Sequence, residues 1–161
     1  NMEAGHLHFI VQEKPHELFK RKGADLLVSK TLSLNEALCG FEWKIYHLDK
    51  REIIIKSRPG EIIKAEKDNR TPFVKLVSGE GMPSHGNPFV KGDLYVIFTV
   101  EFPEDGDLKP DQIEVLRKAL PVASMAIEYD PDTAEVSYLG SAEVNNFGKG
   151  CVASPDAADN S

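Results

Sequence analysis

Cysteine is scarce in this chain of 161 residues: only Cys39 and Cys151 are present. Zinc sites are built from several cysteines or histidines at short spacing, so we expect no metal site and no cofactor. Two cysteines outside any motif also argue against a disulfide scaffold. They are typical of a reducing compartment, and we expect a cytoplasmic protein.

The chain also lacks long hydrophobic runs and an excess of positive charge. A membrane-spanning helix needs about 20 apolar residues, and because no stretch approaches that length we expect no membrane span. The formal net charge is −7, and residues 121–161 carry seven acids against one base, Lys149. Nucleic-acid binding depends on basic surface, so nucleic acid is not an expected partner.

Reactive side chains in a catalytic arrangement are missing as well. Ser84, His85 and Asp93 belong to a Gly- and Pro-rich segment with no nucleophile elbow or oxyanion hole. His6 and His8 share one face of a predicted strand, but two ligands are too few for a metal. We therefore expect no enzymatic activity.

Alternation of apolar and polar residues dominates the first two thirds of the chain. This period of two predicts β-strands with one buried face. The predicted strands cover residues 6–12, 25–33, 41–46, 51–57, 73–77 and 94–102. Strands of this kind pack in two layers, so we expect a mainly β fold, a small two-layer β-sandwich over residues 17–103. The Gly- and Pro-rich residues 84–92 are expected to form an exposed loop.

One short helix is predicted inside this domain. Ser33 stands before residues 35–39, and Glu36 follows three residues later, which is the pattern of a capping box. Gly40 supplies the stop.

A second helix is predicted over residues 110–120. Pro110 suits the first turn and Pro121 ends the segment. Ile113, Leu116 and Leu120 form one apolar stripe, which Val115 and Ala119 widen. Beyond residue 122 the sequence is acidic and rich in small residues, so we expect a partly disordered acidic tail over residues 122–161.

Several ordered motifs resemble the second C-terminal domain of DnaJ-type co-chaperones. They are residues 25–41, 47–55 and 59–63, the run Gly79-Glu-Gly-Met-Pro83, and residues 92–103. Residues 19–25 and 127–131 are most similar to the zinc-region-bearing class A. Residues 8–16 resemble the strand that leaves the first C-terminal domain, so residues 1–16 are expected to be that exit strand. The abrupt start suggests a fragment, with Asn1 and Met2 as cloning residues.

The resemblance implies a fold, a function and partners. It implies a DnaJ C-terminal-domain-like sandwich at 17–103, a dimerisation helix at 104–121, and the tail at 122–161. It also implies binding of unfolded client polypeptides, homodimerisation, and work with a DnaK-type chaperone through the parent chain in protein folding. The His-Pro-Asp of a J-domain and the Cys-x-x-Cys repeats are not in this sequence. The sequence itself is therefore expected neither to stimulate ATP hydrolysis nor to bind zinc.

Two sets of site residues follow, and for each a plainer interpretation stays open. The predicted dimer interface comprises Pro110, Ile113, Leu116, Ala119 and Leu120, although a lone amphipathic helix more often docks on its own core. The candidate client-binding residues are Phe41, Trp43 and Ile54, although Phe41 and Trp43 also fit a core position. The alternative function is a structural module that binds one dedicated partner through the same dimeric β-domain.

Overall fold

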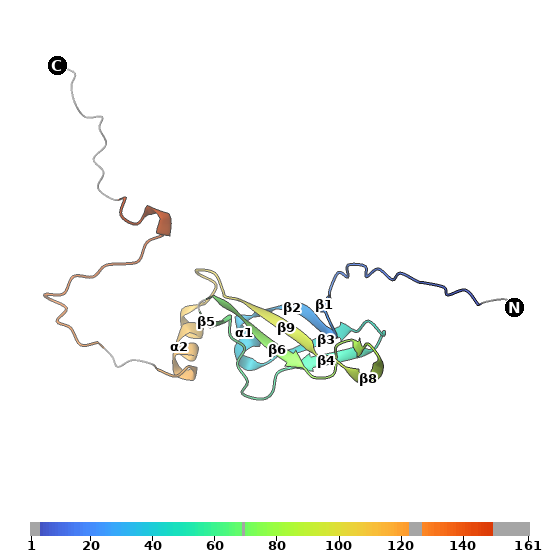
Figure 1. Cartoon of the computed structure of the whole chain (residues 1–161). Coiled ribbons are helices and arrows are strands. Elements are labelled where there is room, and N and C mark those ends of the chain that lie inside the picture. Colours follow the sequence, from blue (N-terminus) through green and yellow to red (C-terminus); the bar gives the residue numbers. More distant parts are fainter. Residues whose placement is uncertain (1–3, 69, 123–126, 150–161) are drawn as a thin grey trace, which may run out of the picture. The chain divides into compact units, whose positions relative to one another are not determined.

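The computed structural model describes residues 4–68, 70–122 and 127–149 (Figure 1). The chain divides into two compact units, Asn1–Ile113 and Glu114–Ser161, and the division falls inside a helix. The first unit contains all the strands that the described residues form, so the mainly β fold predicted from the sequence is confirmed.

A five-stranded sheet forms the larger layer of the first unit. Its strands follow the order β1 (Lys20–Lys22), β2 (Asp25–Ser33), β9 (Leu94–Glu101), β6 (Thr71–Val77) and β5 (Glu66–Asp68). The central pair β2 and β9 is parallel, and the other pairs are antiparallel. Parallel pairing of β2 with β9 sets Leu26 beside Leu94 and Val28 beside Val96, which gathers the apolar residues on one face.

The second layer is the hairpin of β3 (Glu42–Tyr46) and β4 (Glu52–Lys56), together with helix α1 (Leu34–Cys39). The buried core joins both layers. Its members are Phe19, Leu26, Val28, Leu32, Ala37, Phe41, Ile45, Ile63, Leu94, Val96 and Phe98. The two-layer arrangement agrees with the sandwich predicted from the alternation.

The start and stop of α1 follow the predicted signals. The Ser33 hydroxyl accepts the N–H of Glu36 at 3.2 Å, and the Glu36 carboxylate accepts the N–H of Ser33 at 3.2 Å. Gly40 has a φ of 109° and donates its N–H to the Glu36 carbonyl at 3.1 Å. Glycine adopts this positive φ without the steric cost that other residues meet, so the helix ends there.

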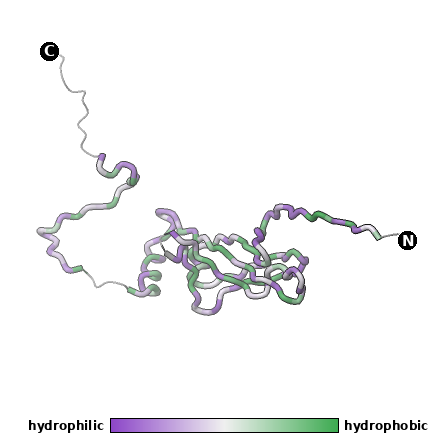
Figure 2. Tube along the Cα trace, viewed as in Figure 1, coloured by the Kyte–Doolittle hydropathy of each residue, from purple (hydrophilic) through white to green (hydrophobic). Residues whose placement is uncertain are grey.

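Two predictions about irregular segments are corrected. Residues 85–91 are exposed and Ser84 and Gly92 are half-buried, but most of residues 84–92 form a hairpin of β7 (Pro83–Ser84) and β8 (Asn87–Lys91) rather than the expected loop. Gly86, with a φ of 85°, makes the reversal possible. The strand predicted at residues 6–12 is not formed. Among the described residues no strand pairs with this segment, and its apolar side chains Phe9 and Ile10 are exposed. Figure 2 shows hydrophobic residues along this N-terminal stretch.

Helix α2 (Pro110–Ala119) ends one residue earlier than predicted. The Gln112 side chain accepts the N–H of Lys109 at 2.9 Å, which satisfies a donor at the start of the helix. In the described part of residues 120–149, the one regular element is the 3-10 turn η1 (Val144–Asn146). Residues 150–161, including Cys151, lie outside the described residues, and disorder of the tail stays a prediction.

Candidate interaction surfaces

One end of the main sheet is formed by the short hairpin of β1 and β2. Lys22 pairs with Asp25, so the connecting turn is Gly23 and Ala24, and Gly23 has the positive φ of 62° that such tight turns require. β1 is one of the two edge strands of this sheet, and all three of its residues are exposed. Its side chains Lys20, Arg21 and Lys22 are all basic.

The backbone of β1 leaves hydrogen-bonding groups at its free edge. Arg21 stands opposite Leu26, and Leu26 donates its N–H to the Asp93 carbonyl at 2.9 Å, away from β1. In an antiparallel ladder only alternate pairs exchange hydrogen bonds. Because Leu26 faces the other way, its opposite residue Arg21 directs its own N–H and C=O outward. The edge can therefore accept another strand.

The outer face of the main sheet, which faces away from the core, carries an apolar patch. Lys20, Leu27, Tyr95 and Leu76 form one row across four strands. Ser29, Ile97 and Val74 form the next row. We call the apolar members the outer patch: Leu27, Val74, Leu76, Tyr95 and Ile97. Leu76 is 53% exposed and Val74 42%, whereas the other three are half-buried.

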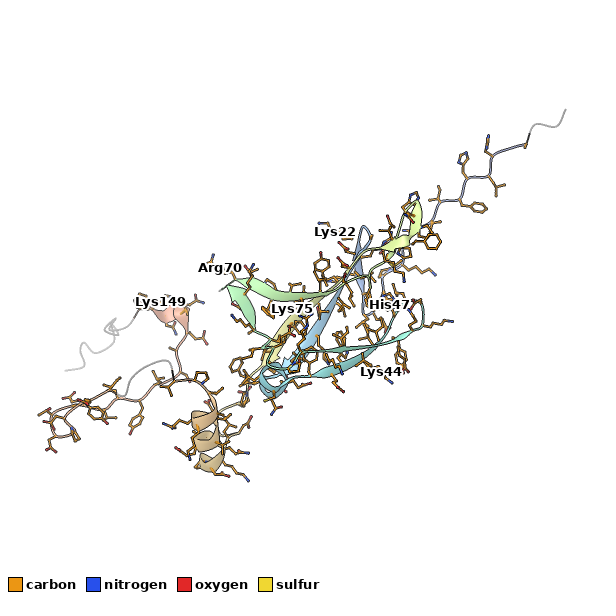
Figure 3. All side chains as sticks on the ribbon, turned by 90° about the horizontal axis from the view of Figure 1, so that it is seen from below. Lys22, Lys44, His47, Arg70, Lys75 and Lys149 are labelled. Carbon is orange, nitrogen blue, oxygen red and sulfur yellow. The ribbon has the colours of Figure 1, made fainter. Side chains whose placement is uncertain are left out.

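A depression of about 540 Å³ lies where the outer patch meets β1. It is lined by Lys20, Arg21, Lys22, Gly23, Asp25, Leu26, Leu27 and Tyr95. Leu27 and Tyr95 supply apolar wall and the β1 side chains supply a basic rim. Lys22 lies on the β1–β2 side of the domain, whereas Lys44 lies on the β3–β4 layer (Figure 3).

The three candidate client-binding residues do not form one surface. Phe41 is buried, with its ring centroid 5.6 Å from that of Phe98. Trp43 is half-buried and packs against the core. Trp43 pairs with Ile55 and the next pair is Lys44 with Ile54, so Ile54 lies on the opposite face of the hairpin and is exposed. Phe41 is therefore a core residue, as the plainer interpretation holds. The arrangement of the three residues does not support one shared client-binding groove.

Neither the β1 edge nor the outer patch was predicted from the sequence. β1 has three residues, too few to show a period, and all of them are basic. A signal for the patch was present in β9, where Tyr95 and Ile97 occupy the face opposite the core residues. Apolar residues on both faces of one strand indicate that both faces make contacts.

The predicted dimer residues lie on α2 or directly after it. Ile113 is 40% exposed, Leu116 37% and Leu120 47%, and no residue of the helix is buried. Leu120 still donates its N–H to the Leu116 carbonyl at 2.9 Å and so continues the stripe by one residue. An apolar stripe thus stays accessible along the helix.

A polar cluster around His47 joins the β3–β4 turn to residue Glu80. The buried His47 ring accepts the N–H of Leu48 at Nδ1, so its Nε2 carries the proton and donates to the Glu80 carbonyl at 2.8 Å. Arg51 forms ion pairs with Asp49 and Glu80. The hydrogen bond from Arg51 lowers the pKa of Asp49, and the Glu80 and Asp49 carboxylates raise the pKa of Arg51. Each group has a partner, so the cluster fixes the turn.

The other polar candidates lie in or beside the β7–β8 hairpin. The Asp93 carboxylate accepts the N–H of Gly79 at 2.8 Å, and Ser84 and His85 belong to the β7–β8 hairpin. Within the described ranges, no three metal-ligating side chains come together. None of the helices in that part of the chain has the length and apolar character to cross a membrane.

Comparison with known proteins agrees with this architecture. Residues 1–103 match the family model described as DnaJ C terminal domain. The chain belongs to the DnaJ family of co-chaperones. The family model covers all the strands, the β1 edge and the outer patch.

The relatives of this DnaJ domain carry DnaJ names. The chain is 49% identical over 122 residues to "Chaperone protein dnaJ 2" of Arabidopsis thaliana, which covers 76% of the chain and 27% of that protein. It is 42% identical over 135 residues to "DnaJ homolog subfamily A member 2" of Bos taurus, covering 84% of the chain and 31% of the relative. The similarity to class A is therefore confirmed. The chain spans about a third or less of these relatives.

Proposed function

We propose that this chain is the client-binding and dimerising part of a DnaJ co-chaperone that works with a DnaK-type chaperone in protein folding. The observation that carries the proposal is the open edge of β1 beside the outer patch. A protein that holds unfolded segments needs free backbone groups and apolar contact, and no chemistry on the bound chain.

Binding by strand addition follows from this geometry. An extended client segment would pair with the outward N–H and C=O of Arg21. Side chains of the added strand alternate between faces, so every second one would lie on the same face of the sheet as Lys20, Leu27 and Tyr95. Main-chain hydrogen bonds are common to all sequences, which gives broad and weak recognition.

Dimerisation through α2 would compensate for weak single sites. The stripe of Ile113, Leu116 and Leu120 is accessible, and the same surface on a second copy would meet it across a two-fold axis. Two linked sites raise the effective concentration of the second for a client already held at the first. Avidity then replaces tight binding at one site.

The partnership with a DnaK-type chaperone belongs to the parent protein. Its support is the similarity to much longer relatives that are named as DnaJ chaperones or DnaJ homologs. A cytoplasmic location fits the scarcity of cysteine in the sequence.

The test measures aggregation of several unrelated denatured proteins at increasing concentrations of the chain. The proposal predicts that aggregation of each is slowed and that affinity for isolated apolar peptides is weak. Tight, stoichiometric binding to a single natural protein, with no effect on denatured proteins, would instead support the structural module with one dedicated partner.

A further inference from the structure

We infer that the β1 edge selects extended segments carrying carboxylates beside an apolar side chain. This inference rests on the proposed client binding and adds a chemical preference to it. The single occupant is an acidic, apolar strand from another polypeptide, paired with the β1 edge beside the depression. The charge of the β1 edge and the position of that charge on the pleat both favour such a strand.

The β1 edge concentrates positive charge at three consecutive residues. Within the described part of the chain, neither Lys20 nor Lys22 forms an ion pair. Arg21 contacts the exposed Glu13 at 3.5 Å and also donates to the Gly23 carbonyl at 2.8 Å. The two lysines are therefore available to a bound chain.

Acidic groups beside the depression offset this charge only in part. Asp25 lines it, but its carboxylate accepts the Asp93 N–H at 2.9 Å and is held at the turn. Glu13 is an exposed partner of Arg21. The three basic residues of β1 thus exceed the two acids that accompany them.

The position of the lysines matches the pleat of an added strand. Lys20 stands opposite Leu27 and Lys22 opposite Asp25, so both lysines lie on the outer face. Residues two apart on a paired strand share a face and lie beside their cross-strand neighbours. Carboxylates at alternate positions of the segment would meet the two lysines. An apolar residue two positions further on would lie on the same face as Leu27 and Tyr95, which line the depression.

A different role for the lysines makes the opposite prediction. Lysines on an edge strand also discourage unwanted pairing with other chains. If protection were their only role, binding would show no preference for acidic over basic segments. The sign of the preference separates the two roles.

The experiment uses three fluorescein-labelled peptides of equal length with the same apolar residues and with acidic, neutral or basic residues at alternate positions. Fluorescence anisotropy measures their affinity for the full 161-residue chain at low and high salt. We expect the acidic peptide to bind about tenfold more tightly than the basic one at low salt, and the difference to shrink at high salt.

Two double variants assign the preference to β1. Lys20→Glu with Lys22→Glu should reverse it, and Lys20→Gln with Lys22→Gln should abolish it. The control is Lys50→Glu with Lys64→Glu, which changes the charge equally at exposed residues outside the main sheet and should preserve the preference.

The possible results separate the preference for acidic segments from the proposed client binding on which it rests. Equal affinity for all three peptides overturns the charge preference and leaves client binding intact. An equal effect of the β1 and control variants also overturns it, because the net charge of the chain would then be the cause. If none of the peptides binds, both the preference and the proposed strand addition are wrong.

Discussion

Gly92 lies so close to Ala24 that a Cβ at Gly92 would collide with the Ala24 carbonyl group. Backbone hydrogen bonds hold the two segments at this distance. Gly92 donates its N–H to the Met82 carbonyl at 2.9 Å, and Met82 donates to the Ala24 carbonyl at 2.7 Å. The turn between β1 and β2 is thereby clamped to the β7–β8 hairpin, and the clamp fixes the β1 edge.

Replacing Gly92 should therefore destabilise the domain. Gly92→Ala forces backbone segments apart, which costs on the order of 1–3 kcal/mol, as in other overpacked sites. Gly5→Ala is the matched control, because a Cβ at Gly5 meets nothing within 4 Å. Urea unfolding followed by circular dichroism measures both. Equal urea midpoints for Gly92→Ala and the unmodified chain would show that the backbone segments can move apart without loss of stability.

Acid should weaken the contact that holds residues 58–63 to β6. The Glu61 carboxylate accepts the Arg58 N–H at 2.9 Å and pairs with Lys75 at 3.3 Å. These partners lower the pKa of Glu61 below its ordinary value of 4.5, the Arg58 hydrogen bond contributing most. A lowered pKa stabilises the fold above pH 4.5, and this stabilisation is lost as the pH falls through the folded-state value.

The variant Glu61→Gln tests this pH dependence. It should lower the urea midpoint near neutral pH, and its midpoint should change less than that of the unmodified chain when the pH falls below 4.5. Glu17→Gln, at an exposed residue, is the control and should follow the unmodified chain. A parallel loss of stability in Glu61→Gln and the unmodified chain would mean that other carboxylates govern the acid response.

Leu116→Asp should shift the chain toward monomer. Burying one leucine contributes about 1.5–3 kcal/mol, and a two-fold interface buries the residue twice. Sedimentation should show a dimer for the unmodified chain at tens of micromolar, where about −6 kcal/mol of association is visible. Lys118→Gln makes the same change of charge and should remain dimeric.

Two results would contradict pairing through α2. If the unmodified chain is monomeric at that concentration, the predicted dimer does not form. Global unfolding of Leu116→Asp would indicate that the helix docks on its own core. The strands should instead keep their circular dichroism signal, because the core residues all precede α2.

Local signals in the sequence predicted elements whose stability comes from nearby residues. β2 was predicted with its observed bounds, because Leu26, Val28 and Leu32 alternate over a length sufficient to show the period. The capping box of Ser33 and Glu36 predicted α1 because its hydrogen bonds span three residues.

Features that depend on distant partners could not be predicted in this way. β1 is a strand because Lys22 pairs with Asp25 across a tight turn, and its side chains show no apolar period. The outward direction of Arg21 depends on the contact between Leu26 and Asp93, 67 positions apart in the chain. Phe41 and Ile54 both look like surface candidates on apolar character alone. Only the pairing register reveals which face each residue occupies.

The proposed strand addition has one direct test, at the backbone of Arg21. Proline has no N–H, and it is tolerated on an edge strand where that N–H faces outward. Arg21→Pro removes the donor together with the charge, whereas Arg21→Gln removes the charge alone. The two variants therefore separate main-chain pairing from electrostatics.

Anisotropy of a labelled neutral apolar peptide is the decisive measurement. Loss of one main-chain hydrogen bond is worth about 1 kcal/mol, so Arg21→Pro should weaken binding at least about fivefold relative to Arg21→Gln. The urea midpoints of the two variants should agree, which excludes unfolding as the cause. Equal affinity of the two folded variants would contradict strand addition at β1.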